Sequence, residues 1–239
     1  MAAPEAPGAD RRQPKKSRIT YPVRAALSAW LQAQAKRAYA DFGRRYRVLD
    51  IGCGIKPYAP FFDPYVESYV GVDIGNPAAD LEGSAEALPV DDSSFDLLLC
   101  TQVLEHVEDP DQAVREFHRV TSPGGRVLAS THGVQVYHPA PTDYWRWTHT
   151  GLALLFERSA EWESVSVAPV GGAATCLAAT TAVYVDLLFR KAHLRPLARA
   201  SVWTLNSLGA LVDRAVPSLR EPIPGSLHLN YHVVADKPR

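Results

Sequence analysis

The chain has 239 residues, of which 46% are hydrophobic and 21% charged, as in a soluble globular protein with one large domain or two small ones. Its formal net charge of -1 at pH 7 gives no global attraction to nucleic acid or to an anionic membrane, so we expect no nucleic-acid partner. The three cysteines are widely spaced, which argues against a zinc site or a disulfide framework and favours a reducing, cytoplasmic setting.

Residues 1–18 contain proline, glycine and a basic cluster, but no apolar core of the length that a signal peptide needs. The basic residues are Arg11, Arg12, Lys15, Lys16 and Arg18. We interpret this segment as a disordered basic tail in front of a single domain over residues 19–239.

Predicted helices and strands alternate between residues 21 and 130. Apolar residues recur at helical spacing over 21–42, and Gly43 follows where that helix would end. Asp109 and Pro110 suit the N-cap and the first position of another helix. Short apolar runs predict strands over 46–51, 68–74, 80–83, 95–100 and 126–130. The alternation predicts an α/β fold with a doubly wound, Rossmann-like, mostly parallel sheet.

The second half of the chain has a less regular pattern. We expect a helix over 148–158, a strand over 161–170 and an antiparallel last strand over 230–235. Between these strands, residues 172–214 are apolar and predict two helices joined near Pro196. This segment would form an insertion within the domain.

Charged residues in this apolar insertion argue against a transmembrane span. Asp186, Arg190 and Lys191 interrupt it at about the length that a span requires. One interpretation is a helical cap over the sheet or the substrate pocket. The other is an interfacial surface in which Arg190, Lys191, Arg195 and Arg199 lie among leucines, which would allow peripheral membrane contact.

Ligands of doubly wound sheets bind beyond the carboxyl ends of the strands, where this chain has distinctive residues. Gly52 and Gly54 flank Cys53 in a turn that would let a ligand approach the backbone. Asp73 ends the next predicted strand and is placed to accept hydrogen bonds from ribose hydroxyls. These features favour a nucleoside cofactor. Pro57 stands where the dinucleotide fingerprint has its third glycine, which argues against a nicotinamide oxidoreductase.

Five motifs in chain order resemble those of class I S-adenosylmethionine-dependent methyltransferases, of the small-molecule, methyltransferase-11-like type. They span about half of the chain and are far more specific together than singly. They are Val48-Leu49-Asp50-Ile51-Gly52-Cys53-Gly54, Tyr69-Val70-Gly71-Val72-Asp73, Ala85-Glu86-Ala87-Leu88-Pro89 through Phe95-Asp96, Val103-Leu104-Glu105-His106-Val107, and Pro123-Gly124-Gly125.

The resemblance implies that S-adenosyl-L-methionine is the cofactor and assigns residues to its parts. Asp50, Gly52, Cys53 and Gly54 would hold the methionine end, and Asp73 the ribose. Ile74, Ala85 and Glu86 would contact adenine, although Ser84 stands where family members often have an aspartate for the adenine amino group. Cys100, Thr101 and Gln102 would lie beside the sulfonium.

The segment 137–147 follows the fifth predicted strand and concentrates aromatic and polar residues over the expected cleft. Tyr137, Asp143, Tyr144 and Arg146 are candidates for recognising a hydroxylated or ring-bearing substrate. The alternative is that the aromatic residues only pack a lid. We expect the methyl acceptor to be a small hydroxylated metabolite, a sugar or another glycan, or a lipid-linked intermediate, with O-methylation favoured.

Methyl transfer to an alcohol needs proton removal, and histidine is the side chain best matched to that task near neutral pH. His132 follows the fifth predicted strand and is the preferred base, with His138 as an alternative. His106 follows the fourth strand, where a structural role is favoured. The lack of paired ligands argues against a metal. A non-catalytic, S-adenosylmethionine-binding interaction protein remains an alternative function, and the sequence carries no signal for an oligomeric state.

Overall fold

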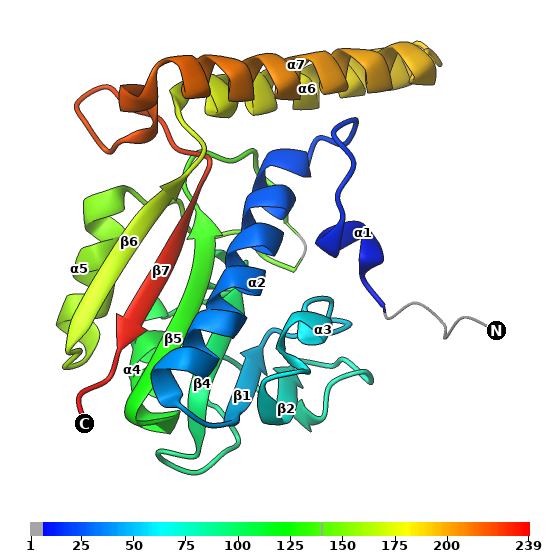
Figure 1. Cartoon of the computed structure of the whole chain (residues 1–239). Coiled ribbons are helices and arrows are strands. Elements are labelled where there is room, and N and C mark those ends of the chain that lie inside the picture. The colour runs from blue at the N-terminus through cyan, green and yellow to red at the C-terminus, as the bar shows by residue number, and fades with distance from the viewer. Residues whose placement is uncertain (1–6, 140) are drawn as a thin grey trace.

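A seven-stranded sheet forms the centre of the computed structural model, which describes residues 7–139 and 141–239 (Figure 1). The strand order is β3-β2-β1-β4-β5-β7-β6. β1 to β5 pair in parallel, and β7 runs antiparallel to both of its neighbours. The doubly wound α/β prediction with an antiparallel last strand is therefore confirmed. The strands are β1 (Tyr46–Ile51), β2 (Val66–Asp73), β3 (Leu81–Glu82), β4 (Phe95–Thr101), β5 (Thr121–His132), β6 (Ser164–Val170) and β7 (Asn230–Asp236).

Helices cover both faces of this sheet. The helices of the described residues are α1 (Ala9–Arg12), α2 (Tyr21–Phe42), α3 (Ala59–Phe62), α4 (Pro110–Val120), α5 (His149–Ser159), α6 (Ala173–Lys191) and α7 (Arg195–Ala215), with 3-10 turns η1 (Leu104–His106) and η2 (Pro217–Arg220). Of these, α2 and α3 pack on one face and α4 and α5 on the other. The helix α2 has the predicted bounds and ends at Gly43, which has a φ of 65°. The carboxylate of Asp109 caps α4 by accepting a hydrogen bond from the Gln112 backbone N–H at 2.9 Å.

The strand β4 shows why the central strands are apolar throughout. Leu97 and Leu99 pack in a core cluster with α2 and α3, whereas Leu98 and Cys100 pack in a second cluster with α4 and α5. Successive side chains of a strand point to opposite faces, so a strand covered on both faces needs apolar residues at every position.

The amino-terminal segment differs from the prediction. Residues 7–18, expected to belong to a disordered tail, contain α1 and pack against the rest of the chain. The Arg12 guanidinium donates to the Pro57 carbonyl at 2.6 Å, and Ser28 Oγ donates to the Arg12 carbonyl at 2.6 Å. Asn206 donates to the carbonyls of Lys16 and Arg18. The backbone of this segment is ordered by distant partners, which its composition does not reveal. Residues 1–6 of the predicted tail lie outside the described residues.

The two predicted helices of the insertion form an antiparallel hairpin, α6 and α7, that crosses the carboxyl-end side of the sheet (Figure 1). A Cβ on Gly209 would lie 2.9 Å from the Ala178 Cβ, so the helices approach closely there. Asp213 caps α6, since its carboxylate accepts hydrogen bonds from the backbone N–H groups of Gly172, Ala174 and Thr175. The turn between the helices projects beyond the sheet.

Among the described residues, α6 is the single helix long and apolar enough to cross a membrane by length and composition. The most apolar 18-residue stretch of α6 has a mean hydropathy of 1.3, and 22% of that stretch is buried inside the structure. The absence of a transmembrane span stays a prediction.

Candidate functional site

A cavity of about 940 Å³ lies at the carboxyl ends of the parallel strands. Loops that follow β1, β2, β4 and β5 form most of its wall, together with the start of α2, the amino-terminal segment and one side of α6. This is the edge at which doubly wound sheets bind their ligands.

The glycine turn after β1 forms one part of the wall. Gly52 and Gly54 have φ values of 65° and 54°, a backbone conformation that favours glycine. A Cβ on Gly52 would lie 2.3 Å from Val103 Cγ2, so Gly52 allows close packing of the loop after β4. A Cβ on Gly54 would meet no atom within 4 Å, so Gly54 leaves space that a ligand can fill.

Asp73 holds this turn from the end of β2. Its Oδ2 accepts a hydrogen bond from the Gly54 backbone N–H at 2.9 Å, and its Oδ1 accepts one from the Ile74 N–H at 2.9 Å. Asn76 also donates to Oδ2. A carboxylate has about four acceptor sites. Three of those on Asp73 are occupied, so Asp73 can hold the turn and still accept a hydrogen bond from a ribose hydroxyl at Oδ1.

Further along the wall lie the residues expected to contact adenine. Ile74 is 70% exposed beside the cavity, and Ser84 and Ala85 line it. Glu86 lines it as well, but its carboxylate accepts a hydrogen bond from the Asp109 N–H at 2.6 Å. Glu86 therefore also connects this wall to the start of α4.

The predicted cofactor residues Asp50, Cys53 and Cys100 are not on the cavity wall. Asp50 is buried, accepts a hydrogen bond from the Tyr69 hydroxyl at 2.6 Å, and has its pKa raised to about 7 by burial. Burial also raises the pKa of both cysteine thiols. Asp50 and Cys100 belong to β1 and β4, whose side chains point to the two faces of the sheet, and Cys53 is buried in the turn that follows β1. Thr101 and Gln102, which follow Cys100, do line the cavity.

Arg11 lines the cavity from the amino-terminal segment and was not among the predicted site residues. Its positive charge acts on Asp50 and Tyr58, where it lowers the pKa of each group against the dominant effect of burial. Arg11 is thus a cationic residue near the end of the cavity formed by the glycine turn. The basic cluster was the one sign of Arg11 in the sequence, and it did not indicate that the amino-terminal segment folds back onto the cavity.

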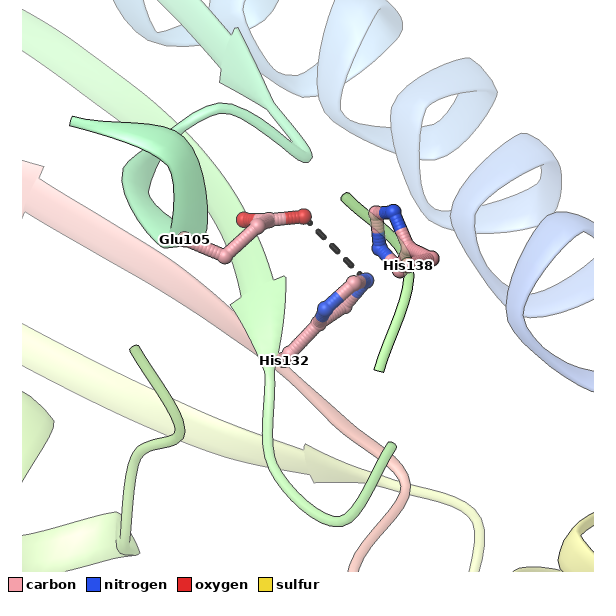
Figure 2. Close-up of side chains that lie close together, drawn as sticks. All are labelled: Glu105, His132 and His138. Atoms are coloured by element: carbon pink, nitrogen blue, oxygen red, sulfur yellow. Dashed lines mark ion pairs between the residues drawn. The ribbon is translucent and has the colours of Figure 1, made fainter. Parts of the chain in front are cut away.

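Three polar side chains meet in the wall next to the ends of β4 and β5 (Figure 2). Glu105, from η1, is fully buried, and its Oε2 accepts a hydrogen bond from Thr131 Oγ1 at 2.8 Å. Its Oε1 lies 3.1 Å from His132 Nε2. The His138 ring points toward the same pair, with its centroid 4.9 Å from that of His132.

Burial disfavours charge on both members of the Glu105–His132 pair. It raises the pKa of Glu105 to about 7 and lowers the pKa of His132 to about 3. Near neutral pH the histidine is therefore uncharged and the carboxyl group of Glu105 is partly ionised. The pair as a unit can therefore accept one proton from a substrate once Glu105 has ionised.

The three predicted histidines lie together, but they differ in their contacts. The His106 ring is 5.1 Å from that of His138, and His106 Nδ1 hydrogen-bonds the carbonyl of Thr142. This contact holds the loop that follows β5, in keeping with the structural role favoured for His106. His132 has the buried carboxylate partner. Glu105 was missed as a site residue, although it belongs to the recognised motif after the fourth strand.

The ligand atoms of Glu105, His132 and His138 lie within 4.8 Å of one another, so they could hold a metal ion. The prediction that no metal binds rested on spacing along the chain. Spacing along the chain does not predict ligands that come from three separate elements, here η1, β5 and the loop after β5. Metal dependence therefore has to be tested directly.

The four predicted substrate residues do not line the cavity. Asp143 and Arg146 form a bidentate ion pair with two distances of 2.6 Å, and Arg146 also donates to the carbonyls of Gln135 and Val136. This pair closes the loop on itself. Tyr144 donates to Glu108 at the surface.

Two aromatic residues of the same loop pack against each other and against the segment after η1. The Trp145 and Trp147 rings are stacked 5.7 Å apart, and Trp145 Nε1 donates to the Val107 carbonyl. Tyr137 is 73% exposed and is not part of the cavity wall. From this loop, Gln135, Val136, His138 and Pro141 line the cavity instead. The sequence located the loop but not which of its side chains turn inward.

The fold and the cavity define a doubly wound α/β protein with a nucleoside-binding edge, and the comparisons with known proteins agree. A family model described as "Methyltransferase domain" matches residues 49–129. An uncharacterized methyltransferase, YcgJ, of Bacillus subtilis is 35% identical over 109 residues, 39% of this chain and 43% of that protein. A ubiquinone biosynthesis O-methyltransferase of Pseudomonas aeruginosa is 34% identical over 104 residues, 36% of this chain and 44% of that protein.

A solved structure shares the fold over a longer range. It is the 1,6-didemethyltoxoflavin-N1-methyltransferase of Burkholderia thailandensis with bound S-adenosylhomocysteine, with a TM-score of 0.52 and 17% identity. The similarity covers 100% of this chain and 94% of that one. In sequence, by contrast, the matched segments span less than half the length of the curated relatives named above.

Residues 49–129 are thus similar to the methyltransferase domain of class I S-adenosylmethionine-dependent methyltransferases. S-adenosylmethionine is the cofactor of this class, and the wall fits it: Gly54 leaves open space, Asp73 offers carboxylate oxygens, and Ile74 presents an apolar surface.

Proposed function

We propose that this protein transfers a methyl group from S-adenosylmethionine to a hydroxyl oxygen of a partly apolar acceptor. The observation that carries the proposal is the buried Glu105–His132 pair in the cavity wall, with its 3.1 Å separation. A sulfonium methyl group needs little activation, so the demands on the protein are to position the acceptor, exclude water and remove a proton.

The reaction balances with the groups at hand. The acceptor oxygen forms a bond to the methyl carbon while the carbon–sulfur bond breaks and its electrons stay on sulfur. The hydroxyl proton passes to His132, and the neighbouring Glu105 carboxylate stabilises the resulting imidazolium. The products are a methyl ether and S-adenosylhomocysteine. His138 lies beside the pair and would orient the acceptor.

The size and composition of the cavity support an acceptor with an apolar part. Its volume of about 940 Å³ is at the upper end of ordinary ligand pockets, so a cofactor and an acceptor can share it. Val23 and Leu27 of α2 and Ala179 and Val183 of α6 form apolar wall. The name of the Pseudomonas relative, a ubiquinone biosynthesis O-methyltransferase, is in keeping with a hydroxylated ring that carries a lipid chain.

The decisive experiment measures transfer of label from S-adenosyl[methyl-³H]methionine to a panel of phenols, sugars and hydroxylated polyprenols. We expect turnover with one acceptor class, rising tenfold per pH unit below about pH 7 and levelling off above it, because protonated Glu105 cannot support proton uptake. Glu105→Gln should remove this pH dependence and most of the activity. Binding of S-adenosylhomocysteine with no turnover on any acceptor would favour the non-catalytic alternative.

A chelator arm separates the proton-accepting role from a metal-binding role of the same residues. If Glu105, His132 and His138 act as proposed, dialysis against a chelator leaves turnover unchanged. Loss of activity that one added divalent metal restores would assign the cluster to a metal instead.

A further inference from the structure

The α6–α7 hairpin has an apolar surface that no other part of the described chain covers. Most of the large apolar side chains that are exposed in this protein lie between residues 177 and 227. They include Leu187, Leu188, Leu194, Leu197, Trp203 and Leu211, and Leu188 is 66% exposed. Exposed apolar patches of this kind mark interaction sites in soluble proteins.

The exposed residues are not the ones that hold the hairpin together. The helices meet through small residues such as Ala182, Ala198 and Gly209, which are buried. Another side of α6 contributes Ala179, Thr180 and Val183 to the cavity wall. The large side chains therefore point away from both contacts, and their exposure follows from the fold of the hairpin.

Charge distinguishes the partners that this surface could accept. No acidic residue occurs between Asp186 and Asp213, whereas Arg190, Lys191, Arg195 and Arg199 all lie there. Asp186 is paired with Arg190 at 2.7 Å, and buried Asp213 caps α6. The hairpin thus presents apolar and cationic groups together, in a chain whose net charge is -1.

We propose that the α6–α7 hairpin docks this protein on an anionic lipid bilayer. Leucine and tryptophan side chains would enter the boundary between headgroups and acyl chains, and the basic residues around the turn would pair with lipid phosphates. A second copy of the chain is a poorer occupant, because Arg190 is already paired with Asp186 and residues 187–212 offer no acidic group to pair with Lys191, Arg195 and Arg199.

The hairpin lies flat on the bilayer and does not cross it. Asn206 of α7 is buried and bonds to the backbone of residues 16 and 18, and Asp213 caps α6. A spanning arrangement would break these contacts and place Asn206 and Asp213 in hydrocarbon, where unpaired polar groups are costly.

Docking in this way brings the active site close to lipid. Since α6 lines the cavity on one side and is exposed on others, the cavity would lie about one helix diameter, roughly 10–12 Å, from the headgroups. An acceptor with a lipid chain could then enter without leaving the membrane. This consequence rests on the proposed function, whereas docking itself does not.

Vesicle flotation of the full-length protein tests the proposal without cofactor or acceptor, so its outcome is independent of catalysis. We expect flotation with vesicles of phosphatidylcholine and phosphatidylglycerol, much weaker flotation with phosphatidylcholine alone, and release by high salt. Leu188→Asp and Arg195→Glu should each weaken binding about tenfold or more. Leu154→Asp on α5 and Lys36→Glu on α2 are matched controls at exposed positions and should leave binding unchanged.

Circular dichroism and S-adenosylhomocysteine binding would show that each variant is folded. Absence of binding to anionic vesicles by the folded protein overturns the proposal. So does a dimer in solution that Leu188→Asp converts to monomer while vesicle binding stays absent, because the surface would then be a contact between copies. Resistance to high salt and alkaline wash would overturn the flat arrangement in favour of insertion.

Discussion

The cofactor half of the domain, which comprises β1 to β5 and the helices packed on them, is built on the opposite principle from the α6–α7 hairpin. In the cofactor half, apolar residues of β1 and β4 are buried from both faces by helices, and polar groups collect at one edge of the sheet. In the hairpin, small residues form the contacts and large apolar residues face outward. The family model covers residues 49–129 and thus lies wholly within the first region. The residues that match the family model therefore lie in the buried region and not in the exposed hairpin.

Stability measurements should show this contrast most strongly. Phe117 on α4 is fully buried, and Phe117→Ala should lower the free energy of unfolding by about 3–5 kcal/mol through lost packing and a cavity. Leu188→Ala on α6 should change it by about 0.5 kcal/mol or less, because Leu188 contributes little to the core. Urea unfolding followed by circular dichroism measures both. A large loss for Leu188→Ala would mean that the hairpin is part of the folding core.

Within the cofactor half, the largest effect on turnover should come from the proton acceptor. His132→Ala should lower kcat about 100-fold or more and leave the affinity for S-adenosylhomocysteine unchanged, because His132 acts on the acceptor. Steady-state kinetics and calorimetry separate the two quantities. If His132→Ala and His138→Ala both stay within a few-fold of the wild-type kcat, positioning alone accounts for catalysis.

Asp73 should produce the opposite pattern, a loss in binding. Asp73→Ala should weaken S-adenosylhomocysteine binding by about 1.5–3 kcal/mol, as expected for lost hydrogen bonds to a charged group. Asp73→Ala also removes the hydrogen bond that Asp73 Oδ2 accepts from the Gly54 backbone N–H, which holds the turn. Asp73→Asn keeps one acceptor oxygen and should have a smaller effect. Unchanged calorimetric affinity in both variants would rule out Asp73 as the ribose ligand.

The smallest of these effects concerns the amino-terminal segment. Arg11→Ala should weaken S-adenosylhomocysteine binding about two- to fivefold, as expected for a partly exposed positive charge on the cavity wall. Arg18→Ala lies in the same segment but not on the cavity wall and serves as the matched control. Equal effects of the two substitutions would indicate a general influence of positive charge.

Local patterns in the sequence predicted much of the fold. The helix α2, the strand β1 and the Asp109 cap of α4 have the expected positions, because helical spacing, apolar runs and capping residues act over a few neighbouring residues. The short helices α1 and α3 carry too few residues for a periodic signal. Partners of residues 7–18 lie far along the chain, so their order could not be predicted from the segment itself.

The candidate site was predicted in outline only. The motif turns and Asp73 were located because their roles depend on backbone position. Side-chain direction was the source of the errors. Cys100 points into the same core cluster as Leu98. The guanidinium of Arg146 donates to Asp143 and to loop carbonyls and so does not reach the cavity. Such choices depend on which partner lies within reach after folding, and a single sequence does not specify this.

The place where the hairpin enters the sheet makes the molecule modular. Val170 and Asn230 are paired neighbours at the ends of β6 and β7, so everything between them leaves and returns through adjacent strands. A connection of this kind can change in length and composition without disturbing the sheet, since its closure cost grows slowly with length. Replacement of the exposed residues of this segment would leave β6 and β7 paired, whereas replacement of Ala179, Thr180 and Val183 would also change the cavity wall.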